Sequence, residues 1–167
     1  ERRDIQVILT THSPDLAAAC DPEEVVIVRK DASNRTISRR VGDLPLASKL
    51  KERLFQQTRL HLDATRSSAL FADRVLIVEG VTEATLLRIL GRAWATGDER
   101  RIGFIDSLAI LPLGHKIGEW PLRLLATPGH ELVTKVAALS DTDLRGTPLP
   151  TPSPPLWHAQ LDSSTAR

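Results

Sequence analysis

The chain has 167 residues, of which 22 are basic and 21 acidic, for a formal net charge of +1. Apolar residues make up 41% and charged residues 26%, which favours a folded core over disorder. The near-neutral balance means that any DNA contact must come from local basic patches. A single cysteine, Cys20, excludes an internal disulfide framework and a zinc ribbon. The absence of tyrosine excludes, for this chain, enzymes that hold a DNA strand on a tyrosine.

The apolar runs and the first residues of the sequence bear on the cellular location of the protein. No apolar run approaches the roughly 20 residues of a membrane-spanning helix, so no membrane association is expected. The charged start ERRDIQ lacks the apolar core of a signal peptide. With Glu1 in first place, we expect a cytoplasmic piece of a longer protein.

The first forty-four residues predict strand, helix and hairpin. The run IQVILT at 5–10 is apolar and β-branched, which predicts a buried parallel strand. A short helix is predicted over 15–20, with Ser13 as its N-cap. EEVVIVRK at 23–30 predicts a second buried strand, and TISRRV at 36–41 predicts its hairpin partner.

From residue 45 to 72 the pattern becomes helical. Near-helical spacing with charges between the apolar positions predicts a long helix or helix pair that acts as a connector. The leucines that carry this spacing are Leu46, Leu50, Leu54 and Leu60.

The next segment, 73–146, alternates strands with helices. The pattern predicts, in order, a strand at 75–78, a helix to Leu90, a polar loop at 94–101, a strand within 107–114, a helix at 118–127 and a strand at 133–143. Such alternation predicts an α/β fold with a parallel sheet flanked by helices. The proline-rich stretch that follows predicts an extended tail or truncated end over 147–167.

Carboxylates follow two of these predicted strands. Glu79 comes directly after VLIV, and Glu83 falls in the first turn of the next helix. Asp141 and Asp143 end the last strand, where residues two apart share a face. If the strands are neighbours, these acids converge at the carboxyl edge of the sheet and repel one another unless a cation is present. Hard oxygen ligands at this density suit Mg²⁺ or Mn²⁺.

Taken singly, these acids have simpler explanations. An acid in the first turn of a helix, such as Glu83, complements the helix dipole, and two aspartates after a strand are common in turns. Glu79 is harder to explain by solubility, since it stands between four apolar strand residues and a glycine.

Two segments resemble known domains. VLIVEGVTE, followed about sixty residues later by LSDTD, resembles the TOPRIM fold over residues 73–146. QVILTTHSPDLAAACDPEEVVIVRKD resembles the last part of an ABC-type ATPase domain. An ABC-like end, a helical connector and a TOPRIM domain, in that order, resemble the OLD (overcoming lysogenization defect) family of nucleases, for which phage defence is a plausible context.

The resemblance implies a metal-dependent DNA endonuclease that hydrolyses phosphodiester bonds with two Mg²⁺ or Mn²⁺ ions. In it, Glu79, Glu83, Asp141 and Asp143 are the metal ligands, and Lys116 of the Gly114-His115-Lys116 turn contacts the scissile phosphate. The implied domains are the end of the ATPase domain at 1–44, the helical linker at 45–72, the TOPRIM catalytic domain at 73–146 and the tail at 147–167.

The resemblance also implies roles that need upstream sequence. His12 stands where an ABC-type histidine approaches the γ-phosphate of ATP. No GxxxxGK[ST] motif occurs, so ATP binding would require an upstream part of the ATPase domain. A homodimer formed through that ATPase domain is the implied assembly.

Basic residues on the connector are candidate contacts to the DNA backbone, namely Lys49, Lys51 and Arg53. A solvated helix face also explains them. The alternative function is a non-catalytic TOPRIM module that binds DNA or a protein partner within a recombination or repair ATPase. The four acids favour the nuclease, whereas the absence of an expected helix and strand after Gly146 favours the module.

Overall fold

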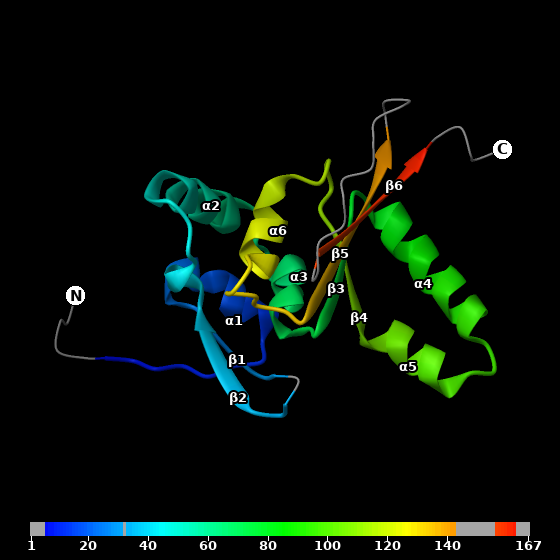
Figure 1. Ribbon diagram of the computed structural model, residues 1–167, viewed down its shortest axis with the longest axis horizontal. Helices are drawn as coiled ribbons and strands as arrows, with labels where there is room; N and C mark the ends of the chain where they lie inside the picture. The colour runs from blue at the N-terminus through cyan, green and yellow to red at the C-terminus, as the bar shows by residue number, and fades with distance from the viewer. Residues whose placement is uncertain (1–5, 32, 143–155, 163–167) are drawn as a thin grey trace.

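A computed structural model describes residues 6–31, 33–142 and 156–162 of the chain, with side chains through residue 140. Its centre is a parallel sheet with the strand order β4-β3-β5-β6 (Figure 1). The strands, in chain order, are β1 (Val26–Lys30), β2 (Thr36–Arg40), β3 (Arg74–Val78), β4 (Leu108–Pro112), β5 (Lys135–Thr142) and β6 (Leu156–Asp162). The expected parallel α/β, Rossmann-like architecture is confirmed.

Helices cover both faces of this sheet. In chain order they are α1 (Pro14–Ala19), α2 (Ser48–His61), α3 (Ala64–Ser67), α4 (Val81–Ala95), α5 (Glu99–Ser107) and α6 (Glu119–Ala126), with 3-10 turns η1 (Pro22–Glu24), η2 (Val41–Asp43) and η3 (Ser68–Phe71). Helices α4 and α5 lie on one side of the sheet, and α1, α3 and α6 on the other (Figure 1). Among the described residues, no helix is both long and apolar enough to cross a bilayer.

The chain order of the strands creates a switch point at β3. From β3 the chain passes through α4 and α5 to β4 on one side, and then through α6 to β5 on the other side. The first connection therefore runs outward from β3 to β4, and the second runs back past β3 to β5. Open α/β sheets place their ligands outside the carboxyl ends of the strands at such a point, here between β3 and β5.

The core is formed by apolar side chains of the sheet, α2 and α6. Parallel strands covered on both faces need apolar residues throughout, which explains the run Val75–Val78. The largest fully buried side chains are Leu44, Leu54, Ile77, Leu113, Leu132, Val41, Val75, Val78, Val133, Val136, Thr58 and Pro121.

The predicted strand at 5–10 is wrong. Residues 6–12 have no regular secondary structure, and the side chains of Val7, Ile8 and Leu9 are 61–85% exposed. A strand needs a neighbour that satisfies its backbone groups. In the described part of the chain, no strand pairs with this segment.

The helix and hairpin that follow are confirmed. Helix α1 begins after Ser13, whose hydroxyl accepts a hydrogen bond from the Leu16 N–H at 3.4 Å. Strands β1 and β2 pair antiparallel. The strand at 23–30 is half-buried rather than buried, since a two-stranded sheet covers only one face and Val28 is 65% exposed. On the covered face, the Arg29 guanidinium donates to the Thr134 hydroxyl and the Glu131 carbonyl, each at 2.9 Å.

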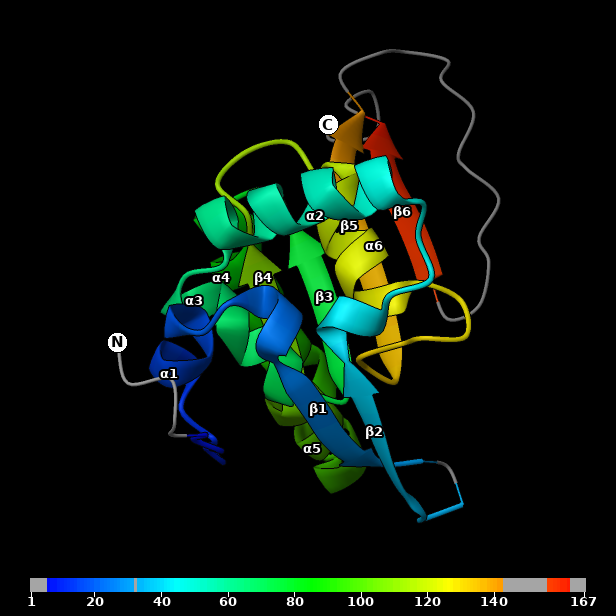
Figure 2. The same ribbon diagram turned by 90° about the vertical axis from the view of Figure 1, so that its left-hand side faces the viewer.

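The connector is the predicted helix pair, α2 and α3. Its buried stripe includes Leu54 and Phe55, whereas Leu60 is 77% exposed. Thr58 takes the inward position, and its hydroxyl donates to the Leu54 carbonyl at 2.8 Å. Figure 2 shows α2 crossing in front of the sheet near the carboxyl ends of the strands.

Two segments are more regular than predicted. Helix α5 begins within the predicted loop at 94–101, where the Asp98 carboxylate accepts hydrogen bonds from the Arg100 and Arg101 N–H groups. Asp98 followed by Glu99 is the N-terminal signal that identifies this helix. Strand β6 lies in the range predicted as a tail; it contains no proline, so every residue can donate to the ladder with β5.

An ion pair between η1 and α2 predicts a loss of stability in acid. The Glu23 backbone N–H holds the pKa of the Asp21 carboxyl below its ordinary value of 3.8, with a further contribution from the Arg59 guanidinium at 3.0 Å. The folded state therefore favours the charged form, so this stabilisation is present above the ordinary pKa and is lost as the pH falls through the folded-state value. Thermal melts between about pH 6 and pH 3 should show a smaller acid loss for Asp21→Asn than for the wild type. Equal losses in both proteins would contradict the assignment.

Candidate metal centre

Glu79 lies at the switch point of the sheet. It follows Val78, which pairs with Leu139 of β5. In this register Glu79 lies opposite Ser140, the residue before Asp141. Its side chain is half-buried, and its backbone carbonyl accepts a hydrogen bond from the Gly114 N–H at 2.7 Å. The two strands whose ends carry the predicted acids are thus direct neighbours, as the prediction required.

Glu83 turns back toward this edge from the first turn of α4. An ideal Cβ placed on Gly80 would lie 2.6 Å from Oε2 of Glu83, so the carboxylate fills the space that this glycine leaves open. Oε2 is buried and has no hydrogen-bond partner among the described residues. Burying an unpaired carboxylate oxygen costs free energy, and such an atom could accept a bound cation. The donor chemistry at this edge fits Mg²⁺ or Mn²⁺.

The predicted cluster of four carboxylates is only partly visible, because it also requires Asp141 and Asp143. The backbone of Asp141 belongs to β5, one residue beyond the level of Glu79, while Asp143 lies outside the described residues. Within the portion whose side chains are described, no group of three or more His, Cys, Asp or Glu residues is arranged to hold a metal ion. The structure therefore brings Glu79 and Glu83 to one edge, and the four-acid cluster remains a prediction.

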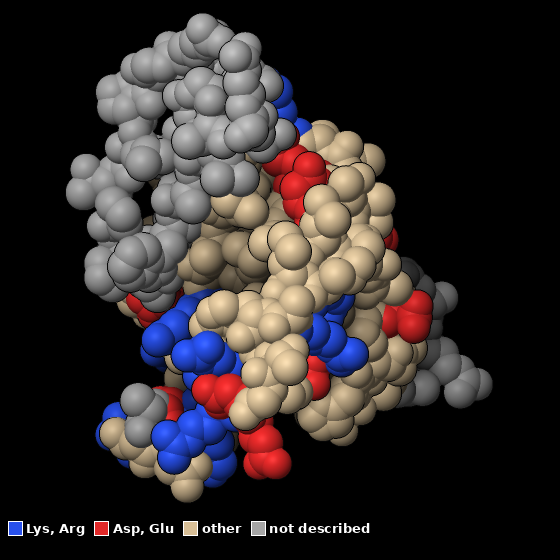
Figure 3. Space-filling model, turned by 90° about the vertical axis from the view of Figure 1, so that its right-hand side faces the viewer, with Lys and Arg blue, Asp and Glu red and all other residues tan. Residues whose placement is uncertain are grey.

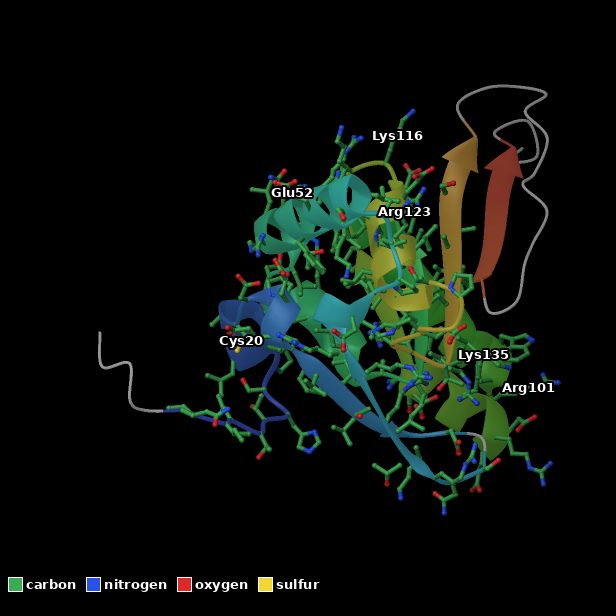
Figure 4. The ribbon with its side chains drawn as sticks, turned by 60° about the vertical axis from the view of Figure 1, so that its left-hand side comes forward. Cys20, Glu52, Arg101, Lys116, Arg123 and Lys135 are labelled. Carbon is green, nitrogen blue, oxygen red and sulfur yellow. The ribbon has the colours of Figure 1, made fainter. Side chains whose placement is uncertain are left out.

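The loop after β4 lies against the same edge. The Leu113 N–H donates to the Val78 carbonyl at 3.0 Å, and Gly114 adopts φ +79°, a conformation that favours glycine. Lys116 follows on this loop and is exposed at the strand-tip end of the molecule (Figure 4). Its contact with a scissile phosphate remains a prediction.

Sequence reasoning missed a cluster of rings that packs beside this loop. The His61 ring lies 5.3 Å from the His115 ring, centroid to centroid, and stacks on Trp120 at 5.8 Å with an interplanar angle of 22°. Nδ1 of His115 donates to the Lys116 carbonyl at 2.8 Å. Only the Gly114-His115-Lys116 turn gave a sequence signal; His61 reaches the cluster through the packing of α2 on α6.

The other predicted residues lie elsewhere. His12 is exposed, and its ring contacts Phe71 of η3 at a centroid distance of 6.2 Å. Lys49 and Arg53 are exposed on α2, whereas the Lys51 ammonium donates to the Gly42 carbonyl at 2.8 Å. Lys51 therefore has a structural bond that the sequence did not predict.

The helix layer formed by α4 is poorly suited to DNA phosphates. Figure 3 shows a broad uncharged area on this side of the molecule. The exposed apolar residues of α4 are Val81, Leu86, Ile89, Leu90 and Trp94. Because phosphate binding depends on cations, this apolar surface offers few groups for a nucleic-acid backbone.

Comparison with known proteins gives no assignment. No family model matches the sequence, and no curated protein matches it.

Proposed function

We propose that this chain is part of a metal-dependent DNA endonuclease of the OLD type, in which a TOPRIM domain follows a helical connector and the end of an ABC-type ATPase domain. The buried Oε2 of Glu83 carries the proposal, since it has no partner among the described residues and lies at the edge that Glu79 occupies. A second support is the β3–β5 adjacency, which puts the backbone of Asp141 at the same edge.

The residues at this edge have distinct roles in the proposed reaction. When bound, two Mg²⁺ or Mn²⁺ ions would activate a water molecule and stabilise charge on the phosphate and the leaving oxygen. Glu79, Glu83, Asp141 and Asp143 would hold these ions. Lys116 would neutralise a DNA phosphate, while Lys49 and Arg53 on α2 would contact the backbone further along the strand. ATP would act through an upstream part of the ATPase domain, with His12 near its γ-phosphate, in a homodimer joined by that domain.

Plasmid cleavage tests the proposal. Supercoiled plasmid incubated with the chain and Mg²⁺ or Mn²⁺ should become nicked or linear, EDTA should stop the reaction, and no protein should remain attached to the DNA ends. A variant of one proposed ligand, purified in parallel, controls for contaminating nucleases. Mn²⁺ binding without cleavage would favour the alternative, a non-catalytic module that binds DNA or a protein partner. The absence of both Mn²⁺ binding and plasmid cleavage would refute the proposal.

A further inference from the structure

Arg66 of α3 joins the connector to the loop beside the proposed metal site. Its Nη1 donates to the Asp63 carboxylate at 2.6 Å and to the His61 carbonyl at 3.0 Å. Its Nη2 donates to the Leu113 carbonyl, 47 residues further along the chain, at 2.7 Å. The side chain is only 21% exposed, so water competes weakly for these bonds.

The Leu113–Gly114 segment is therefore held from two sides. On the sheet side, its N–H groups donate to the Val78 and Glu79 carbonyls at 3.0 Å and 2.7 Å. On the connector side, its Leu113 carbonyl accepts from Arg66. Since Leu113 is fully buried, the segment has little freedom to shift while both sets of bonds persist.

A second contact joins the same two elements. The His61 ring at the end of α2 packs against His115, which is one residue from Lys116. The connector thus meets the loop through a planar guanidinium and through stacked rings. A displacement of the connector relative to the sheet would therefore be transmitted to the loop.

We propose that Arg66 is a positioning residue that sets the Lys116-bearing loop against Glu79, and that the connector helices control the proposed nuclease site through it. The inference rests on the proposed function. Lysine cannot replace this arginine fully, because its point charge lacks the fork that reaches two elements at once.

Two measurements on Arg66→Ala and Arg66→Lys test this role. Hydrogen exchange should be at least about tenfold faster at the Leu113 and Gly114 amides of Arg66→Ala. Its kcat for plasmid nicking should fall about tenfold with KM nearly unchanged. This is the effect expected for a residue that holds a reacting group in position without contacting the substrate. Arg66→Lys should lie between Arg66→Ala and the wild type, since it keeps the charge beside Asp63. The matched control is Arg123→Ala, which removes a half-buried arginine of α6 whose guanidinium pairs, among the described residues, with Glu119 (Figure 4).

The outcomes separate this inference from the proposed function. Faster exchange confined to the loop, together with a fall in kcat at unchanged melting temperature, supports it. Exchange and kcat equal to those of Arg123→Ala overturn it, as does a fall in kcat that merely tracks a lower melting temperature. If the wild type binds Mn²⁺ but cuts no DNA, the role in cleavage is refuted along with the proposed nuclease, and exchange at Gly114 still decides whether Arg66 holds the loop. If Arg66→Ala does not fold, Arg66→Lys decides by the same criteria.

Discussion

Replacing Glu83 with glutamine should reduce metal-dependent plasmid nicking roughly 10³-fold, which corresponds to several kcal/mol of lost transition-state stabilisation. In the same variant, the melting temperature of the metal-free protein should rise. The carboxylate oxygen Oε2 is buried without a partner among the described residues, a cost to the folded state that the proposed cation would offset. A neutral amide of the same shape removes the charge from this partly buried position.

Melting curves with and without Mn²⁺ separate the loss of metal binding from the gain in stability of the metal-free protein. A ligand at 100 times its Kd stabilises the folded state by about 2.7 kcal/mol, and this increment should vanish in Glu83→Gln. Glu52→Gln is the matched control, because Glu52 is exposed on α2 away from the acids (Figure 4). Wild-type Mn²⁺ binding by Glu83→Gln would show that this carboxylate is not a ligand.

The backbone positions of Glu79, after β3, and of Glu83, in the first turn of α4, were predictable from local pattern. Four apolar residues before Glu79 require a covered strand, and a helix must then return the chain to a parallel neighbour. What the sequence left open was whether β5 lies next to β3. That adjacency comes from the route of the chain through α6, which depends on packing across the whole sheet rather than on any short segment.

Where prediction failed, the neighbours of a segment decided its structure. The segment at 5–10 has the composition of a buried strand but no partner among the described strands, so its apolar side chains remain exposed. Leucine spacing placed Leu60 on the buried face of the connector, whereas the packing of α2 turns Thr58 inward and Leu60 outward. Strict helical periodicity agrees with the structure, because Thr58 is four residues after Leu54 and shares its face, whereas Leu60 falls on nearly the opposite side. The prediction followed the leucines alone and so placed Leu60 wrongly.

The contacts of Arg66 illustrate a site feature that no sequence pattern reveals. Arginine near the end of a connector is ordinary composition for an exposed helix. Its importance arises only when α3 packs beside the end of β4 and the guanidinium meets the Leu113 carbonyl. Such contacts between distant segments can be found only from the folded structure.

Replacing Gly80 with alanine should lower cleavage about 100-fold without altering any proposed ligand, the cost expected for moving a reacting group by about 1 Å. The new methyl group would stand 2.6 Å from Oε2 of Glu83, and the next nearest atom is Cδ of the same side chain at 3.7 Å. Only the end of a flexible side chain has to move. The backbone at Gly80, with φ −130° and ψ 172°, accepts alanine, so the fold should lose only about 1 kcal/mol at this N-cap position.

Gly103→Ala provides the matched control for that substitution. Gly103 lies within α5, and a Cβ there would meet nothing within 4 Å, so alanine should stabilise the helix by about 0.5–1 kcal/mol and leave cleavage unchanged. Calorimetric titration should show weaker Mn²⁺ binding for Gly80→Ala, and the plasmid assay should show slower nicking. Gly103→Ala should match the wild type in both measurements. If Gly80→Ala retains full metal affinity, the Glu83 carboxylate does not need its present position, and its burial against Gly80 would serve the packing of α4 rather than a metal. If affinity falls while the melting temperature of the metal-free protein drops by only the few degrees that about 1 kcal/mol costs, the glycine is required because any side chain would displace a metal ligand.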